Sequence, residues 1–196
     1  YGSDLPGWNL TRLLSELLNK VPGDYRIRLG SLEPLDINPS LLELVQGNKR
    51  ICRHFHIPLQ SGSNRILESM QRRYSREYYR HLLRDISQRI PEAAFAADVM
   101  VGYPGEEEKD FQDTLNLVTE LPLFDLHVFK FSPRPGTRAA TLFPRVEQNV
   151  QQRRSKLLLD LAAQKKKEFI NRFIGQHLCI LVEQEIEKGK YEGLSD

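Results

Sequence analysis

The chain has 196 residues, 40% of them hydrophobic, and a formal net charge of +2 at pH 7. A chain of this size and composition can bury one sizeable core with, at most, a small appended module. No apolar run approaches the roughly 18–20 residues that span a bilayer, and no signal sequence opens the chain. We therefore expect a cytoplasmic protein without a membrane contact, and the small net charge does not by itself indicate nucleic-acid binding.

Four segments share the order strand, loop, helix. In each, a short apolar run ends in a polar loop, and the predicted strands are residues 25–32, 52–59, 94–101 and 125–131. Serial units of this kind predict parallel strands that are adjacent in chain order, joined by right-handed helical connections. Ligands of such α/β sheets bind at the loops that follow the strands.

Capping residues predict where the helices begin. Asn38 and Pro39 are typical of a helix start, and Gly47 is placed where a left-handed residue ends a helix. Ser75 precedes another apolar face with helical spacing. The acidic run 106–108 indicates a helix start, because negative charge complements the positive end of the helix dipole; a metal site is the weaker interpretation.

The last quarter of the sequence changes in character. Residues 145–172 form a helical pattern with a net charge of +5, which is either a solvated surface helix or an RNA-facing helix with phosphate contacts at Lys165, Lys166 and Lys167. Residues 173–196 have two β-rich runs separated by a turn. We predict three parts: an α/β domain (1–145), a basic linking helix (146–172) and a β segment (173–196).

Four strings in this order resemble the radical-SAM methylthiotransferases, which insert a methylthio group into a tRNA base or a ribosomal-protein aspartate. They are ICRHFHIPLQSGS (51–63), MQRRY (70–74), DVMVGYPGE (98–106) and FSPRPGT (131–137). The string RIRLGSLEP (26–34) is most similar to the branch that acts on N6-threonylcarbamoyladenosine beside the tRNA anticodon. The branch that acts on isopentenyladenosine usually has histidine at the position of Glu33.

The resemblance implies a partial radical-SAM (TIM-like) parallel barrel, strands 3–6, followed by the start of a TRAM domain, a small β-barrel that binds RNA. It also implies S-adenosyl-L-methionine (SAM), [4Fe–4S] clusters and tRNA as a partner, with the sulfur donor and electron donor left open. The family holds its cluster on a Cys-x-x-x-Cys-x-x-Cys loop, but the only cysteines here are Cys52 and Cys179. We therefore interpret the chain as a fragment that lacks the cluster-binding segment and is inactive alone.

The resemblance assigns five residues to SAM. Gln60 and Ser61 fall at its ribose, Arg72 at its carboxylate, Gly102 where the backbone approaches the ligand, and Phe131 near the adenine. Each has a plainer alternative from the residues themselves: Gln60 and Ser61 close a turn, Arg72 forms a salt bridge to a neighbouring helix, the loop 102–105 makes a plain turn at Pro104 and Gly105, and Phe131 packs in the core.

Glu33 and Arg134 are the candidate substrate contacts, because both are charged residues at strand ends, where burial would be costly without a polar ligand. His54 and His56 alternate on one strand face with no third ligand nearby, so we expect no metal site there. The alternative functions are a non-catalytic RNA-binding or scaffold module, and an ordinary α/β enzyme that uses Glu33 and His54 as acid–base groups.

Overall fold

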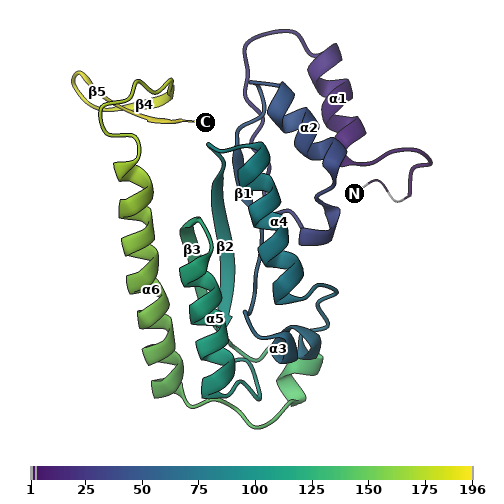
Figure 1. Cartoon of the computed structure of the whole chain (residues 1–196), viewed down its shortest axis with the longest axis vertical. Helices are drawn as coiled ribbons and strands as arrows, with labels where there is room; N and C mark the ends of the chain where they lie inside the picture. The colour runs from purple at the N-terminus through teal and green to yellow at the C-terminus, as the bar shows by residue number, and fades with distance from the viewer. Residues whose placement is uncertain (1, 3, 196) are drawn as a thin grey trace.

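A computed structural model describes residues 2 and 4–195. Two short 3-10 helices cover Pro34–Asp36 and Arg138–Thr141. The helices and strands are α1 (Leu10–Lys20), α2 (Pro39–Gly47), β1 (His54–His56), α3 (Asn64–Ser69), α4 (Arg76–Arg89), β2 (Ala94–Val101), α5 (Glu108–Glu120), β3 (Leu123–Lys130), α6 (Gln148–Asn171), β4 (Leu181–Glu187) and β5 (Lys190–Leu194) (Figure 1).

The central sheet is parallel. Its strand order is β1-β2-β3, so neighbouring strands follow one another along the chain, as predicted. The predicted strand 94–101 has the observed bounds of β2, while β3 begins two residues before the predicted 125–131. Figure 1 shows α4 and α5 in front of the strands and α6 beside β3. The α/β class predicted from serial strand–loop–helix units is confirmed.

The predicted first strand is wrong as a regular element. Residues 25–32 contain no continuous strand, only two isolated parallel bridges, Ile27 with Ile51 and Ser31 with His56. The backbone bends at Arg53 between the two bridged positions, which breaks the register. Pro58 adds to this, because a proline has no amide hydrogen to donate to the neighbouring segment. As a regular strand β1 is shorter than the predicted 52–59, although Ile57 and Leu59 still donate their amides to β2.

The two faces of the sheet differ. Side chains alternate along a strand, and on β2 Phe95, Ala97 and Val99 are buried toward the helices. Asp98 and Met100 point to the opposite side and stay partly exposed. We call this second side the open face. In the described residues, polar side chains of all three strands share this face around Asp98, whereas Ala94, Ala96 and His54 at its other end are buried.

The start of α2 follows the prediction, but its end does not. The Asn38 side chain accepts the Leu41 amide at 3.0 Å, as an N-cap should. Gly47 is the last helical residue and has no positive φ, so the expected left-handed residue is absent at this position. The chain instead leaves in an extended conformation at Asn48, whose side chain accepts the Arg50 amide at 3.0 Å and makes the turn.

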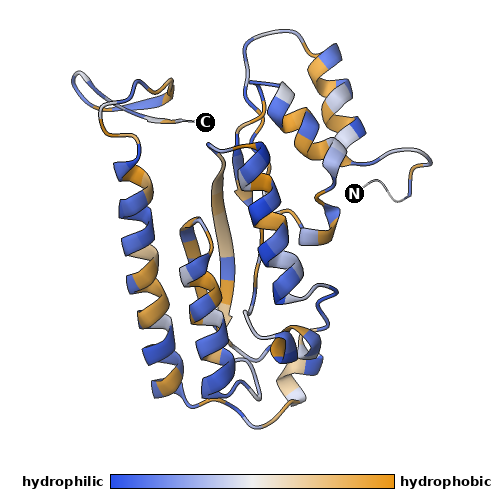
Figure 2. Ribbon diagram, in the orientation of Figure 1, coloured by the Kyte–Doolittle hydropathy of each residue, from blue (hydrophilic) through white to orange (hydrophobic). Residues whose placement is uncertain are grey.

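The next two helix starts are confirmed. Ser75 caps α4 by accepting the Tyr78 amide at 3.1 Å. The acidic run begins α5 through a reciprocal capping box, in which Glu107 and Asp110 each accept the other's backbone amide. In Figure 2 the outward side of α4 is coloured hydrophilic, whereas its buried residues pack in the core beneath.

Helix α6 is attached to the sheet domain through a buried ion pair. Arg154 Nη1 lies 2.7 Å from Glu106 Oε2, and the two side chains are only 4% and 1% exposed. The same Glu106 oxygen accepts the Gly102 amide at 2.7 Å. Burial raises the pKa of Glu106, although the Gly102 amide and Arg154 act in the opposite direction. The carboxylate thus joins α6 to the loop that follows β2.

The C-terminal strands form a separate hairpin. Strands β4 and β5 pair antiparallel, as the two β-rich runs predicted, and their apolar residues are largely exposed. A two-stranded hairpin does not close a barrel, so the TRAM assignment stays a prediction, as do the three domain boundaries. Among the described residues, no helix combines the length and apolar character needed to cross a membrane.

Candidate functional site

A cavity of about 240 Å³ lies where the loops after β1 and β2 meet the 3-10 helix of residues 138–141. Gln60, Arg72, Met100, Tyr103 and Arg138 are among its lining residues. The fold brings these residues together because parallel strands end at the same edge of a sheet. Two of the five predicted SAM residues, Gln60 and Arg72, therefore share one cavity, and the sequence reasoning missed Met100, Tyr103 and Arg138.

Two backbone positions at this cavity are strained. Gln60 and Gln71 are the non-glycine residues with positive φ in the described chain, at 63° and 60°, and both line the cavity. Residues with a side chain rarely adopt this conformation, and such strain concentrates at binding sites. The Gln60 amide donates to Asp98 and its carbonyl accepts from Met100, both on β2, and Gln71 lies two residues after the end of α3, directly before Arg72. These backbone turns aim Gln60 and Arg72 at a common space.

Arg72 is paired with Glu33 across the site. Its Nη1 lies 2.8 Å from Glu33 Oε1, and both side chains are partly exposed. Glu33 lines a second cavity, of about 480 Å³, formed with residues 29–32 and the start of α1. The pair therefore lies between two cavities. Arg72 thus forms the salt bridge that was its plainer alternative. Its partner is Glu33, itself a candidate substrate contact, and not a residue of a neighbouring helix.

Three other predicted SAM residues have structural partners. Ser61 is fully buried and its hydroxyl lies 3.4 Å from that of Thr114 on α5. Gly102 has φ of 77°, and a Cβ there would collide with Gln151 of α6, so helix packing already requires glycine. The Phe131 ring packs edge-on against Tyr103, with centroids 5.6 Å apart, and reaches the first cavity only through that contact.

The two charged substrate candidates are both exposed. Arg134 is exposed, and Glu33 is 53% exposed, so the premise that these charges are buried at strand ends was wrong. Both lie in loops, where water solvates the charge.

The three lysines are not equivalent. Lys165 Nζ donates to the carbonyls of Thr119 and Leu121 at 2.9 and 2.8 Å, and half-burial lowers its pKa. These carbonyls end α5, so Lys165 satisfies a helix C-terminus. Lys166 lies 3.4 Å from Asp125, while Lys167 is exposed.

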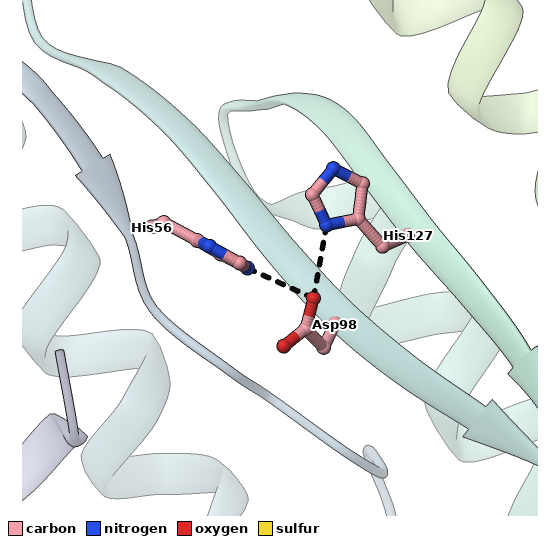
Figure 3. Close-up of side chains that lie close together, drawn as sticks. All are labelled: His56, Asp98 and His127. Carbon is pink, nitrogen blue, oxygen red and sulfur yellow. Dashed lines mark hydrogen bonds and ion pairs between the residues drawn. The ribbon is translucent and has the colours of Figure 1, made fainter. Parts of the chain in front are cut away.

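A cluster on the open face joins all three strands (Figure 3). Asp98 Oδ1 lies 2.8 Å from His56 Nε2 and 3.1 Å from His127 Nδ1. The expectation that no third ligand lies near His56 was wrong, because Asp98 and His127 are far away in sequence and become neighbours through strand pairing. His54 is different: it is buried against Phe124, and burial lowers its pKa to about 4.

No shared acid–base site forms from Glu33 and His54. Glu33 is paired with Arg72, and His54 packs in the sheet, with no contact between them in the described residues. The ordinary α/β enzyme that uses this pair is therefore not supported.

Comparisons with known proteins agree with the parallel α/β fold. The family model of the Radical SAM superfamily matches residues 1–118, more than half of the chain. The chain belongs to the radical SAM superfamily. Coproporphyrinogen III oxidase from Escherichia coli, described as a radical SAM enzyme, superposes with a TM-score of 0.64 and 18% identity over 82% of this chain and 38% of that protein. At this identity the likeness shows the fold alone.

The sequence relatives are tRNA-modifying enzymes by name. A threonylcarbamoyladenosine tRNA methylthiotransferase of Bacillus subtilis is 37% identical over 99% of this chain and 43% of its own length. One from Aquifex aeolicus is 40% identical over 94% of this chain and 45% of its own length. A tRNA-2-methylthio-N6-dimethylallyladenosine synthase of Pelotomaculum thermopropionicum is also 40% identical, over 96% of this chain and 42% of its length. The resemblance to methylthiotransferases is confirmed, and the chain spans less than half the length of these relatives.

The chain's own residues fit SAM but not an iron–sulfur cluster. A guanidinium at the cavity can pair with the SAM carboxylate, and a side-chain amide beside it can bind hydroxyls. A [4Fe–4S] cluster needs grouped thiolates, whereas Cys52 is buried and Cys179 is exposed at the other end of the sequence. These two cysteines cannot form the three-thiolate loop of the superfamily.

Proposed function

We propose that the complete protein carrying this chain methylthiolates a modified adenosine in tRNA, with N6-threonylcarbamoyladenosine as its substrate. The single observation that carries the proposal is the cavity between Gln60 and Arg72, bounded by two strained backbone positions, in a chain whose relatives bear this activity in their names. Because the substrate is tRNA, we place the protein in the cytoplasm.

The cavity residues have distinct roles toward SAM. Arg72 binds the carboxylate, since a guanidinium recognises a carboxylate through two parallel hydrogen bonds. The Gln60 amide binds the ribose hydroxyls, and Tyr103 with Phe131 borders the adenine. Bound SAM would supply the radical after reductive cleavage by an electron from the [4Fe–4S] cluster of the complete protein, and a second SAM molecule would supply the methyl group. Ser61 and Gly102 act indirectly, by fixing the loops that hold Gln60 and Tyr103.

Glu33 and Arg134 contact the substituent that distinguishes the substrate. A threonylcarbamoyl group offers N–H donors and a carboxylate, whereas a dimethylallyl group is apolar. Glu33 can accept from the carbamoyl N–H once SAM's carboxylate engages Arg72, and exposed Arg134 can pair with the threonyl carboxylate. A hydrogen-bond acceptor at one end of the substituent and a positive charge at the other favour the threonylcarbamoyl substrate.

The tRNA backbone is bound elsewhere. We propose Lys166 and Lys167 on α6 as phosphate contacts, with Lys165 contributing less because its amine already caps α5. The hairpin is proposed as the start of the RNA-binding TRAM barrel. Its support is the row of exposed apolar side chains on β4 and β5, among them Leu181, Ile186 and Tyr191, which an isolated hairpin cannot bury.

Nucleoside analysis tests the proposal. The complete protein is expressed in a bacterium that lacks its own threonylcarbamoyladenosine methylthiotransferase, and digested tRNA is examined by mass spectrometry. We expect the methylthio derivative of N6-threonylcarbamoyladenosine, reduced strongly by Glu33→Gln or Arg134→Gln and unchanged by Arg73→Gln, an exposed neighbouring arginine. A methylthio derivative of the dimethylallyl nucleoside would show that the substrate is wrong. The absence of any methylthiolated product would contradict the activity.

A further inference from the structure

We propose that His56, Asp98 and His127 form a binding site for one first-row divalent transition-metal ion on the open face of the sheet. Their potential ligand atoms all lie within 4.8 Å of one another (Figure 3). Each residue belongs to a different strand, so the three positions are fixed by backbone pairing rather than by a mobile loop. Two imidazoles and one carboxylate are a donor set that suits zinc, cobalt and iron in the divalent state.

The distances are close to those of a metal-bound arrangement. With metal–ligand bonds of about 2.0–2.1 Å, tetrahedral ligands lie roughly 3.3 Å apart. Asp98 Oδ1 is 2.8 Å from His56 Nε2 and 3.1 Å from His127 Nδ1. A metal ion would therefore replace the shared protons with small outward shifts at Asp98. The two imidazoles, which meet edge to face at 82°, must approach each other, and because His127 is 49% exposed a turn of its side chain would disturb little packing.

A second interaction orients one ligand. Ser31 Oγ lies 3.1 Å from His56 Nδ1, on the far side of the ring from Asp98. The Ser31 backbone forms a parallel bridge with His56, so this hydroxyl is held in place by the main chain. When Nδ1–H donates to the hydroxyl, the Nε2 lone pair points toward the metal position. Outer hydrogen bonds of this kind fix the tautomer and the ring orientation of histidines that bind metals.

The site is open on one side. His127 is 49% exposed, whereas His56 and Asp98 are 17% and 18% exposed, so solvent reaches the cluster past His127. Three protein ligands with a remaining accessible position are typical of sites where the metal also binds water or another small ligand. Met100, two residues beyond Asp98 on the same face, lines the cavity assigned to SAM. The open position therefore lies on the same surface as that cavity.

Metal titration of this chain tests the site independently of tRNA modification. Co²⁺ is added to the chain while visible absorption is recorded, and Zn²⁺ is then used as a competitor. We expect one equivalent of Co²⁺ to bind and to be displaced by Zn²⁺. His127→Gln should abolish this binding, and so should Asp98→Asn. Because the His127 side chain is half-exposed, its replacement should leave the core intact. Ser31→Ala should weaken it roughly 10- to 100-fold.

Matched controls separate this site from adventitious binding. His81→Ala and the double change His177→Ala with Cys179→Ser remove exposed donors elsewhere and should leave the stoichiometric binding intact. Circular dichroism and urea unfolding confirm that each variant is folded. The proposal is overturned if no equivalent of Co²⁺ binds, if His127→Gln binds it as tightly as the unchanged chain, or if the control changes abolish it.

Discussion

Removing Arg154 should destabilise the protein in a strongly pH-dependent way. The Arg154→Met variant leaves the Glu106 carboxylate buried with the Gly102 amide as its remaining strong partner. Breaking a buried pair in this manner typically costs about 3–5 kcal/mol, because one charge stays in a low-dielectric surrounding. Glu106 can limit this cost by taking up a proton, so the loss of stability in the variant depends on the pH.

The magnitude follows from linkage. An unfolded glutamate has a pKa near 4.5, and burial already raises that of Glu106 in the folded protein. Keeping Glu106 protonated costs about 1.36 kcal/mol for each pH unit above 4.5. This cost is about 3 kcal/mol at pH 7 and less than about 1 kcal/mol at pH 5. Because the raised folded pKa lets the native state keep a proton that the unfolded state releases, the variant's stability falls as the pH rises.

Urea unfolding followed by circular dichroism measures this difference. Unfolding free energies of the unchanged protein and Arg154→Met are compared at pH 5, 6, 7 and 8, and the deficit should grow across the series. The double variant Arg154→Met with Glu106→Gln should not show a deficit that grows with pH, because no ionisable group is left in the buried position. A deficit equal at pH 5 and pH 8 for the single variant would refute the reasoning.

Three further outcomes are expected. Because burial lowers the pKa of His54 from 6.5 to about 4, stability should decline as the pH falls between these values, by up to about 3 kcal/mol. The His54→Leu variant should lack this part of the slope in urea unfolding, and an unchanged slope would contradict the assignment. Gly62→Ala should lower the free energy of unfolding by about 1–3 kcal/mol, because the added Cβ would lie 2.5 Å from the backbone of α5. Gly30→Ala is the control and should be nearly neutral, because no atom lies within 4 Å of its added Cβ. Equal effects of the two changes would contradict this packing. Lys165→Met should lower the melting temperature with little effect on the salt dependence of tRNA binding by the complete protein, and Lys167→Met should do the reverse.

The parallel sheet could be predicted because its signals are local. Each strand is a short apolar run ended by turn residues, and the caps Asn38 and Ser75 follow from side chains that accept nearby amides. The first strand could not be predicted correctly. Whether residues 25–32 pair continuously depends on a bend at Arg53 and on Pro58 in the neighbouring segment, and neither is visible in the strand's own sequence.

The candidate site was predictable only in part. Gln60 and Arg72 were found from short motifs, but their meeting in one cavity depends on two left-handed residues that carry side chains. The His56–Asp98–His127 cluster was missed because strand register brings its members together, and register cannot be read from separate segments. One usable signal existed: a polar residue occupies the same face of three successive predicted strands.

The most direct test of the account is the recognition of the SAM carboxylate by Arg72. Isothermal titration of the complete protein compares SAM with its decarboxylated analogue. Loss of a charge-assisted contact of about 1.5–3 kcal/mol predicts that Arg72→Gln weakens SAM binding roughly 10- to 150-fold. The same change should leave the analogue's affinity unaltered, and Arg73→Gln should affect neither ligand. If Arg72→Gln leaves SAM affinity unchanged, the cavity between Gln60 and Arg72 is not the SAM site.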